Sequence, residues 1–192
     1  MVVVVEPPLG DHPLVSVILP TGFVDRSDYL RAAIGSVLGQ SDDNWELLVI
    51  DDTPEAAYGE GLPGWWPGDS RVTVMSSEGS GQCAARNCGL DAASGTIIAY
   101  LDDDCRWFPW WLHALVATFA DTSIDAVHGV RMIEEPGGLA KAFVRCIDPI
   151  ELHRINPANG NIVGHRAGLS ATRWSSEQIR AATTTSQRIS VM

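Results

Sequence analysis

The sequence predicts an α/β fold in which a mostly parallel central sheet is flanked by helices on both faces. Short apolar runs alternate with amphipathic helical segments through the first two thirds of the chain. Strands separated by single helices pair in parallel, because a parallel connection has to cross one face of the sheet. Both faces of such a sheet are buried, and its ligands bind beyond the carboxyl ends of the strands.

The first strand covers residues 15–19 and ends at Pro20. The helix that follows has one apolar face, formed by Leu30, Ala33, Ile34, Val37 and Leu38. We expect Ser27 or Asp28 to be its N-cap and Gly39 to end it. The second strand covers residues 47–50.

A loop rich in proline, glycine and tryptophan occupies residues 53–70, and residues 71–75 alternate as a third strand. The loop contains Trp65 and Trp66, which could shelter a base or a sugar but more often would anchor the loop to the core.

A helix over residues 81–93 has a buried side of small residues, which lets it lie close to the sheet. These residues are Ala84, Ala85, Cys88 and Ala92. Gly95 precedes a further buried strand over residues 96–101. Pro109 suits the first turn of another helix, whose apolar face is formed by Leu112, Leu115, Val116 and Phe119. Residues 126–132 predict another strand.

The composition limits the classes of partner. There are 24 acidic residues against 13 lysines and arginines, which gives a formal net charge of −11. This balance opposes binding to nucleic acid or to an anionic bilayer. The four cysteines lack the CxxC pairs of a zinc site, and the apolar N-terminal run is too short for a membrane span. We expect reduced thiols in a cytoplasmic protein, with attachment at the inner face of the membrane left open.

Three consecutive carboxylates, Asp102, Asp103 and Asp104, follow a predicted strand. They repel one another unless a cation lies among them, and Mg²⁺ or Mn²⁺ is commonly held by one or two carboxylates together with substrate phosphates. Strand alternation would point Asp102 and Asp104 to one side and Asp103 to the other. The alternative is a solvated acidic loop in front of the helix near Pro109.

Residues 77–89 bring glycines, including Gly81, to the start of a helix whose first amides can meet an anion. Arg86 could pair with a diphosphate, or it could be an ordinary surface arginine. Asp51 and Asp52, at another strand end, could accept hydrogen bonds from a base or ribose, or could simply start a turn.

Six segments together resemble family 2 glycosyltransferases in order and spacing. They are VSVILPT (15–21), SVLGQ (36–40), WELLVIDD (45–52), GSGQCAARNCGL (79–90), GTIIAYLDDD (95–104) and WFPWWL (107–112). The resemblance covers about residues 13–130. It implies a Rossmann-like GT-A fold over residues 13–174, with a donor-binding half at 13–132 and a partial acceptor-side region at 133–174. Residues 1–12 form an extension, and residues 175–192 a polar, disordered tail.

The resemblance also implies roles for individual residues. The nucleotide-sugar would be bound by Pro20, Thr21, Asp51, Asp52, Gly81, Arg86, Asn87, Asp102 and Asp103. Asp104 would be the principal ligand of Mn²⁺ or Mg²⁺, with Asp102 beside it. The implied reaction moves a sugar with inversion from a nucleoside diphosphate sugar, a UDP-sugar being favoured. The acceptor would be the hydroxyl of a saccharide, a lipid-linked molecule or another compound.

Two departures from the family pattern leave alternatives open. Gly22 and Phe23 replace a common Tyr-Asn pair. Residues 161–174 resemble the strand before the helix that usually supplies the catalytic base, and no acidic pair follows them. Glu151 and Glu177 are the nearest acidic candidates, and His165 could complete a metal shell or be structural. A catalytically inactive or truncated nucleotide-sugar binding module is therefore the second hypothesis. A nucleotidyltransferase is the third; it would need a basic loop after the first strand, where residues 22–27 offer only Arg26.

Overall fold

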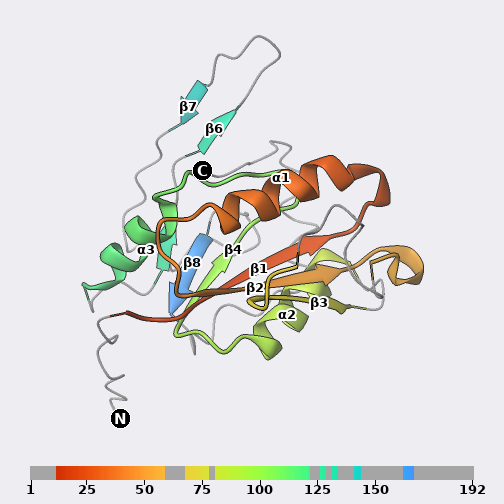
Figure 1. The fold of residues 1–192 in the computed structure, drawn as a ribbon, viewed down its shortest axis with the longest axis horizontal. Helices are drawn as coiled ribbons and strands as arrows, with labels where there is room; N and C mark the ends of the chain where they lie inside the picture. Colours follow the sequence, from red (N-terminus) through yellow and green to blue (C-terminus); the bar gives the residue numbers. More distant parts are fainter. Residues whose placement is uncertain are drawn as a thin grey trace.

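The computed structural model describes residues 12–58, 68–77, 81–121, 126–128, 131–133, 141–143 and 162–166. Its centre is a sheet with the strand order β3-β2-β1-β4-β8-β5, and a separate ladder joins β6 and β7 (Figure 1). The strands are β1 Val15–Thr21, β2 Trp45–Asp51, β3 Val72–Ser76, β4 Ile97–Tyr100, β5 Ala126–His128, β6 Arg131–Ile133, β7 Lys141–Phe143 and β8 Ile162–Arg166. The helices are η1 Val24–Arg26, α1 Ser27–Leu38, η2 Pro54–Ala56, α2 Gln82–Ala92 and α3 Trp111–Phe119.

The four strands β3, β2, β1 and β4 pair in parallel, and β8 joins β4 and β5 in antiparallel pairs. The predicted α/β fold with a mostly parallel sheet is therefore confirmed. None of the helices in the described part of the chain has the length and apolar content that a bilayer crossing requires.

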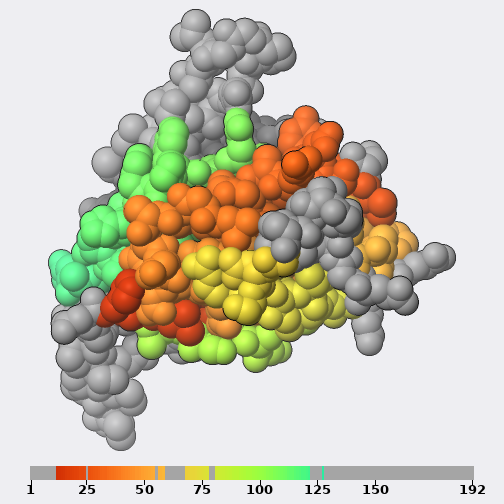
Figure 2. Space-filling view, viewed as in Figure 1, coloured from red at the N-terminus to blue at the C-terminus, as the bar shows by residue number. Residues whose placement is uncertain are grey.

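Successive residues of β1 face opposite sides of the sheet and enter two different cores. Val17 and Leu19 belong to a core with residues of α1 and α3, whereas Ile18 belongs to a core with Ala85 of α2. All seven residues of β1 are buried, as expected for a parallel strand that is covered on both sides. In the space-filling view, the yellow atoms of β3 lie at the front, with the orange atoms of α1 above them and the yellow-green atoms of α2 below (Figure 2). The two helices thus cover opposite faces of the sheet.

The strand ends are staggered, and this stagger shapes the site. β1, β2 and β3 end in register, with Thr21 opposite Asp51. β4 ends earlier, with Tyr100 opposite Ile18. The backbone nitrogen of Pro20 is on the β4 side of β1, because the carbonyl of Ile18, two residues earlier, accepts from Leu101. The pairing with β4 has already ended at Ile18, so the missing N–H of Pro20 removes no hydrogen bond between strands. The chain that follows Tyr100 continues into this space.

Several local predictions are wrong, each for a physical reason. The N-cap of α1 is Arg26, without a side-chain cap, because η1 runs directly into the helix. Pro109 precedes α3, which begins at Trp111. The predicted strand over residues 126–132 is two strands, because β5 joins the central sheet and β6 pairs with β7.

The buried side of α2 also differs from the prediction. It consists of Ala85, Arg86 and Gly89, whereas Ala92 is exposed. Arg86 is buried because it forms an ion pair with Asp102. The tryptophan pair at 65–66, Glu151, Glu177 and the tail at 175–192 lie outside the described residues, as does the side chain of His165.

Candidate active site

Polar side chains from two strand ends are in contact at the carboxyl edge of the sheet. Thr21, the last residue of β1, donates a hydrogen bond from Oγ1 to Asp103 Oδ2 at 2.9 Å, and both residues are buried. This bond joins β1 to the segment after β4. Burial raises the pKa of the Asp103 carboxyl; the hydrogen bond from Thr21 opposes that rise and the neighbouring Asp104 charge adds to it.

Asp102 is held by α2 from the other side of the sheet. Arg86 donates from Nη2 to Asp102 Oδ1 at 2.7 Å, and Gln82 Nε2 lies 3.4 Å from the same oxygen. The Arg86 side chain is only 7% exposed, whereas that of Asp102 remains 34% exposed. A surface arginine is therefore excluded. The pairing explains the burial of Arg86, since a buried guanidinium needs a nearby anion.

Asp52 organises the start of α2. Its Oδ1 accepts hydrogen bonds from Ser77 Oγ at 2.6 Å and from the Gly81 amide at 3.0 Å. Gly81 has a φ of 92°, a conformation that favours glycine over all other residues. The amide that the sequence predicted to meet an anion thus meets a carboxylate of the chain itself.

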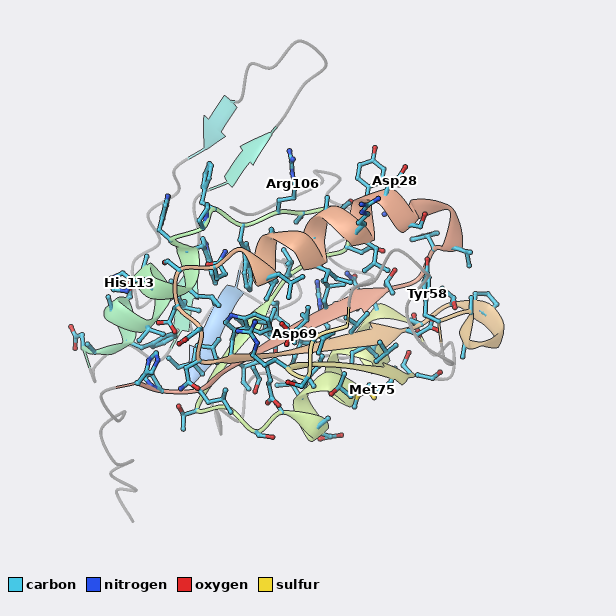
Figure 3. The ribbon with its side chains drawn as sticks, in the orientation of Figure 1. Asp28, Tyr58, Asp69, Met75, Arg106 and His113 are labelled. Atoms are coloured by element: carbon cyan, nitrogen blue, oxygen red, sulfur yellow. The ribbon has the colours of Figure 1, made fainter. Side chains whose placement is uncertain are left out.

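Asp51 is fully buried and supports the loop beyond β2. Its side-chain oxygens accept from the amides of Thr53 at 3.0 Å and Tyr58 at 2.6 Å. Tyr58 lies just after η2, at the end of the molecule to which β2 leads (Figure 3). Of the two neighbouring aspartates, Asp52 is the more exposed and is the one directed to α2.

Asp104 is the most open member of the triplet, with a side chain that is 42% exposed. Arg26 Nη1 lies 3.6 Å from Asp104 Oδ2 and 3.7 Å from Asp103 Oδ1. The predicted alternation of side chains is wrong, since Asp103 and Asp104 share one partner while Asp102 has another. It fails because β4 ends at Tyr100 and a turn follows, closed by a hydrogen bond from the Cys105 amide to the Asp102 carbonyl at 3.0 Å.

The segment after the triplet is fastened to α1 by two polar side chains. Ser36 Oγ accepts from the Trp107 amide at 3.1 Å. Gln40 donates to the Phe108 carbonyl at 2.7 Å and accepts from the Leu112 amide at 2.8 Å. This role was not predicted, although two polar residues four apart at the end of an apolar helix were a signal for it.

The triplet has the chemistry of a site for a hard divalent cation. Its side chains offer carboxylate oxygens, and the most exposed of them belong to Asp104. The three carboxylates do not converge closely; within the described residues, the acidic cluster whose ligand atoms do so is His12, Asp42 and Asp43, near the amino end of β1. One or two carboxylates suffice where substrate phosphates complete the shell, and Asp104 with a neighbour meets that requirement.

Pro20 and Asn87 are the two remaining residues predicted to bind the nucleotide-sugar. Pro20 lies at the end of β1, and Asn87 lies on α2 beside Arg86 and is partly buried. Arg26, Gln82 and Ser77 were missed as contacts of the acidic residues. Ser77 lies 25 positions from Asp52, and Gln82 lies 20 positions from Asp102. No local sequence pattern therefore points to these contacts.

Comparisons with known proteins identify the family of the chain. A family model described as glycosyl transferase family 2 matches residues 16–172. The Escherichia coli UDP-Glc:alpha-D-GlcNAc-diphosphoundecaprenol beta-1,3-glucosyltransferase WfgD is 33% identical over 135 residues, which cover 70% of this chain and 52% of that protein. The chain thus spans about half the length of this curated relative.

Two solved structures share the fold. Residues 1–349 of S. aureus TarS match with a TM-score of 0.58 at 18% identity, covering 85% of this chain and 52% of that one. The mannosyltransferase PcManGT from Pyrobaculum calidifontis, in complex with GDP-Man and Mn²⁺, matches with a TM-score of 0.56 at 20% identity, covering 85% and 47%. With a family model matched over most of its length, this chain belongs to glycosyl transferase family 2 and has the GT-A fold.

Proposed function

We propose that the chain binds a nucleoside diphosphate sugar, a UDP-sugar by preference, and transfers its sugar to an acceptor hydroxyl with inversion, with Mn²⁺ or Mg²⁺ as cofactor. The observation that carries this proposal is the position of Asp52 and of the triplet Asp102–Asp104 at the same edge of the sheet, each joined to α2 or β1, with the buried Arg86 paired to Asp102. WfgD, by its name, uses UDP-Glc and a diphosphoundecaprenol-linked acceptor. A lipid-linked acceptor is accordingly our first candidate here.

The residues divide the work of donor binding. The ends of β1 and β2, with Thr21 and Asp52, would hold the base. Asp102 is fixed by Arg86, and its exposed part can accept hydrogen bonds from ribose hydroxyls. Asp104 would hold the cation against the diphosphate, as its exposure and hard oxygen donors favour.

In an inverting transfer, the acceptor oxygen forms a bond to the anomeric carbon while the bond from that carbon to the diphosphate breaks. The hydroxyl proton passes to a base, which we do not assign to a residue. A bound divalent cation supplies charge stabilisation for the departing diphosphate. Arg86 and Thr21 contribute by keeping Asp102 and Asp103 in place, so that the carboxylates need not reorganise when the donor binds.

The test is calorimetric titration of the folded protein with UDP in the presence of Mn²⁺. We expect binding that depends on the metal and that weakens by roughly tenfold or more in Asp104→Asn, because a charged ligand is lost. Asp28→Asn is the matched control, because Asp28 is exposed on α1 and its substitution removes the same charge (Figure 3). A folded protein that binds no UDP, or an Asp104 variant that binds as well as the control, would refute the proposal.

A second candidate is a nucleotide-sugar binding module without transferase activity. It is favoured by the sequence of residues 161–192, which contains no acidic pair of the kind expected to supply the catalytic base. Mass spectrometry of UDP-sugar mixed with the protein and candidate acceptors separates the two. Release of UDP with formation of a glycosylated acceptor excludes the module, and donor binding without turnover of any acceptor supports it.

A further inference from the structure

Among the described residues, Arg26 is the cation that pairs with Asp104, the carboxylate proposed here as the principal metal ligand. It is the last residue of η1 and the cap of α1, and its Nη1 lies within 3.7 Å of one oxygen from each of Asp103 and Asp104. Within the described part of the chain, these are the ion pairs recorded for those two carboxylates. A divalent cation bound to Asp104 would therefore place its positive charge close to that of the Arg26 guanidinium.

The two arginines at this edge of the sheet are bound very differently. Arg86 makes a 2.7 Å hydrogen-bonded pair with Asp102 and is almost fully buried. Arg26 approaches its carboxylates only to 3.6–3.7 Å, outside hydrogen-bond range, and its side chain is 32% exposed. Its guanidinium lies 4.3 Å from the centre of the Phe23 ring, and Phe23 is itself exposed. An exposed, non-bonded pair of this kind contributes little and can separate at low cost.

We propose that Arg26 is a displaceable counterion, which neutralises Asp103 and Asp104 before the donor arrives and competes with the divalent cation for Asp104. This inference rests on the donor and metal site proposed above. It adds that the divalent cation binds well only together with the nucleoside diphosphate. The cation alone binds poorly, because it must approach Asp104 Oδ2 against the positive charge of Arg26. A nucleoside diphosphate removes the conflict, because its phosphate oxygens give Arg26 a replacement partner.

The consequence is that metal and nucleotide bind cooperatively. Asp103 remains fixed by Thr21 throughout, so only Arg26 and the exposed Asp104 have to change partners. Arg26 contacts the exposed Phe23 ring and makes no short hydrogen bond to Asp103 or Asp104, so its side chain can move without disturbing β1 or α2. Arg26 thus binds the diphosphate and, before the donor arrives, opposes binding of the free divalent cation to Asp104 by charge repulsion.

The experiment measures Mn²⁺ affinity without nucleotide, by electron paramagnetic resonance of the unbound ion, in the wild-type chain and in Arg26→Gln. We expect the variant to bind Mn²⁺ alone about threefold to fivefold more tightly, the range of an exposed ion pair. At saturating Mn²⁺, we expect it to bind UDP about threefold more weakly. Arg31→Gln, which removes an equal charge from the exposed side of α1, is the control and should change neither affinity.

The outcomes separate this inference from the proposed function. If the wild-type chain binds Mn²⁺ and UDP but Arg26→Gln has the same or lower affinity for Mn²⁺ alone, the counterion role is overturned and the donor site stands. If neither chain binds Mn²⁺ or UDP, both proposals fail. Arg26→Met keeps the aliphatic stem against the Phe23 ring and serves as the second variant if the glutamine variant does not fold, as judged by circular dichroism.

Discussion

Substitution of Gly89 by alanine should destabilise the fold, even though alanine is the better helix former. A Cβ built on Gly89 would lie 2.5 Å from Ile18 Cγ2 and 3.1 Å from Cγ1. Ile18 is fully buried in β1, and the contacted atoms lie at the branch of a β-branched side chain, whose χ1 is stiff. Overpacking of this kind costs about 1–3 kcal/mol, and the gain in helix propensity returns about 1 kcal/mol. Because the overlap is severe, we take the upper end and expect a net loss of about 2 kcal/mol.

Urea denaturation followed by circular dichroism measures this loss, and a double-mutant cycle assigns it to the contact. Ile18→Ala alone should cost about 2–5 kcal/mol, because it leaves a cavity beside α2. In Gly89→Ala combined with Ile18→Ala, the new methyl group enters that cavity, so the combined loss should fall short of the sum by at least about 1 kcal/mol. Gly35→Ala is the control, since nothing lies within 4 Å of a Cβ there.

Two results would refute this reasoning: an unchanged or raised urea midpoint in Gly89→Ala, or strictly additive losses in the cycle. The same substitution reports on the site, because Arg86 lies one helical turn before Gly89. If α2 moves outward, the 2.7 Å contact between Arg86 and Asp102 lengthens. We therefore expect weaker UDP binding together with lower stability.

Three further substitutions test other parts of the structure. Ser16→Ala should cost about 1–3 kcal/mol in urea denaturation, because the buried hydroxyl accepts the Gly95 amide at 2.7 Å; an unchanged midpoint would contradict this role. Asp69→Asn should cost about 0.5 kcal/mol at pH 7, since the Arg71 hydrogen bond lowers the pKa of Asp69 below 3.8. A group whose pKa is lower in the folded state contributes stability above its unfolded pKa, and this contribution is lost as the pH falls through the folded pKa. The difference from wild type should therefore shrink, and not grow, as the pH falls below 3.8. Gln40→Ala should speed amide hydrogen exchange in the segment before α3, measured by mass spectrometry, while exchange in α2 stays unchanged.

The central sheet was predictable because burial on both faces leaves a strong local signal. Continuous apolar runs located β1, β2 and β4 to within a few residues, and small residues indicated the close packing of α2. The ends of the elements were less predictable. The cap of α1 depends on η1, a turn that no apolar period marks, and the split between β5 and β6 depends on which partner each segment finds.

The candidate site was predictable in its location but not in its contacts. Parallel strands place their carboxyl ends at one edge, so the positions of Asp52 and Asp102–Asp104 followed from strand order. The bond between Thr21 and Asp103 joins residues 82 positions apart and depends on β4 ending before β1. The burial of Arg86 likewise depends on its charge partner, which a helical period cannot reveal.

The contacts assign two different duties to the acidic residues at this edge of the sheet. Asp51, Asp52, Asp102 and Asp103 each accept a hydrogen bond shorter than about 3.1 Å from another part of the fold, so their orientations are fixed before any ligand arrives. Asp104 is more exposed than its two neighbours in the triplet, and its ion pair is loose. If the donor binds as proposed, only one carboxylate and its arginine have to reorganise. Polar groups held in place in advance stabilise developing charge at little reorganisation cost, so this arrangement would favour departure of the diphosphate.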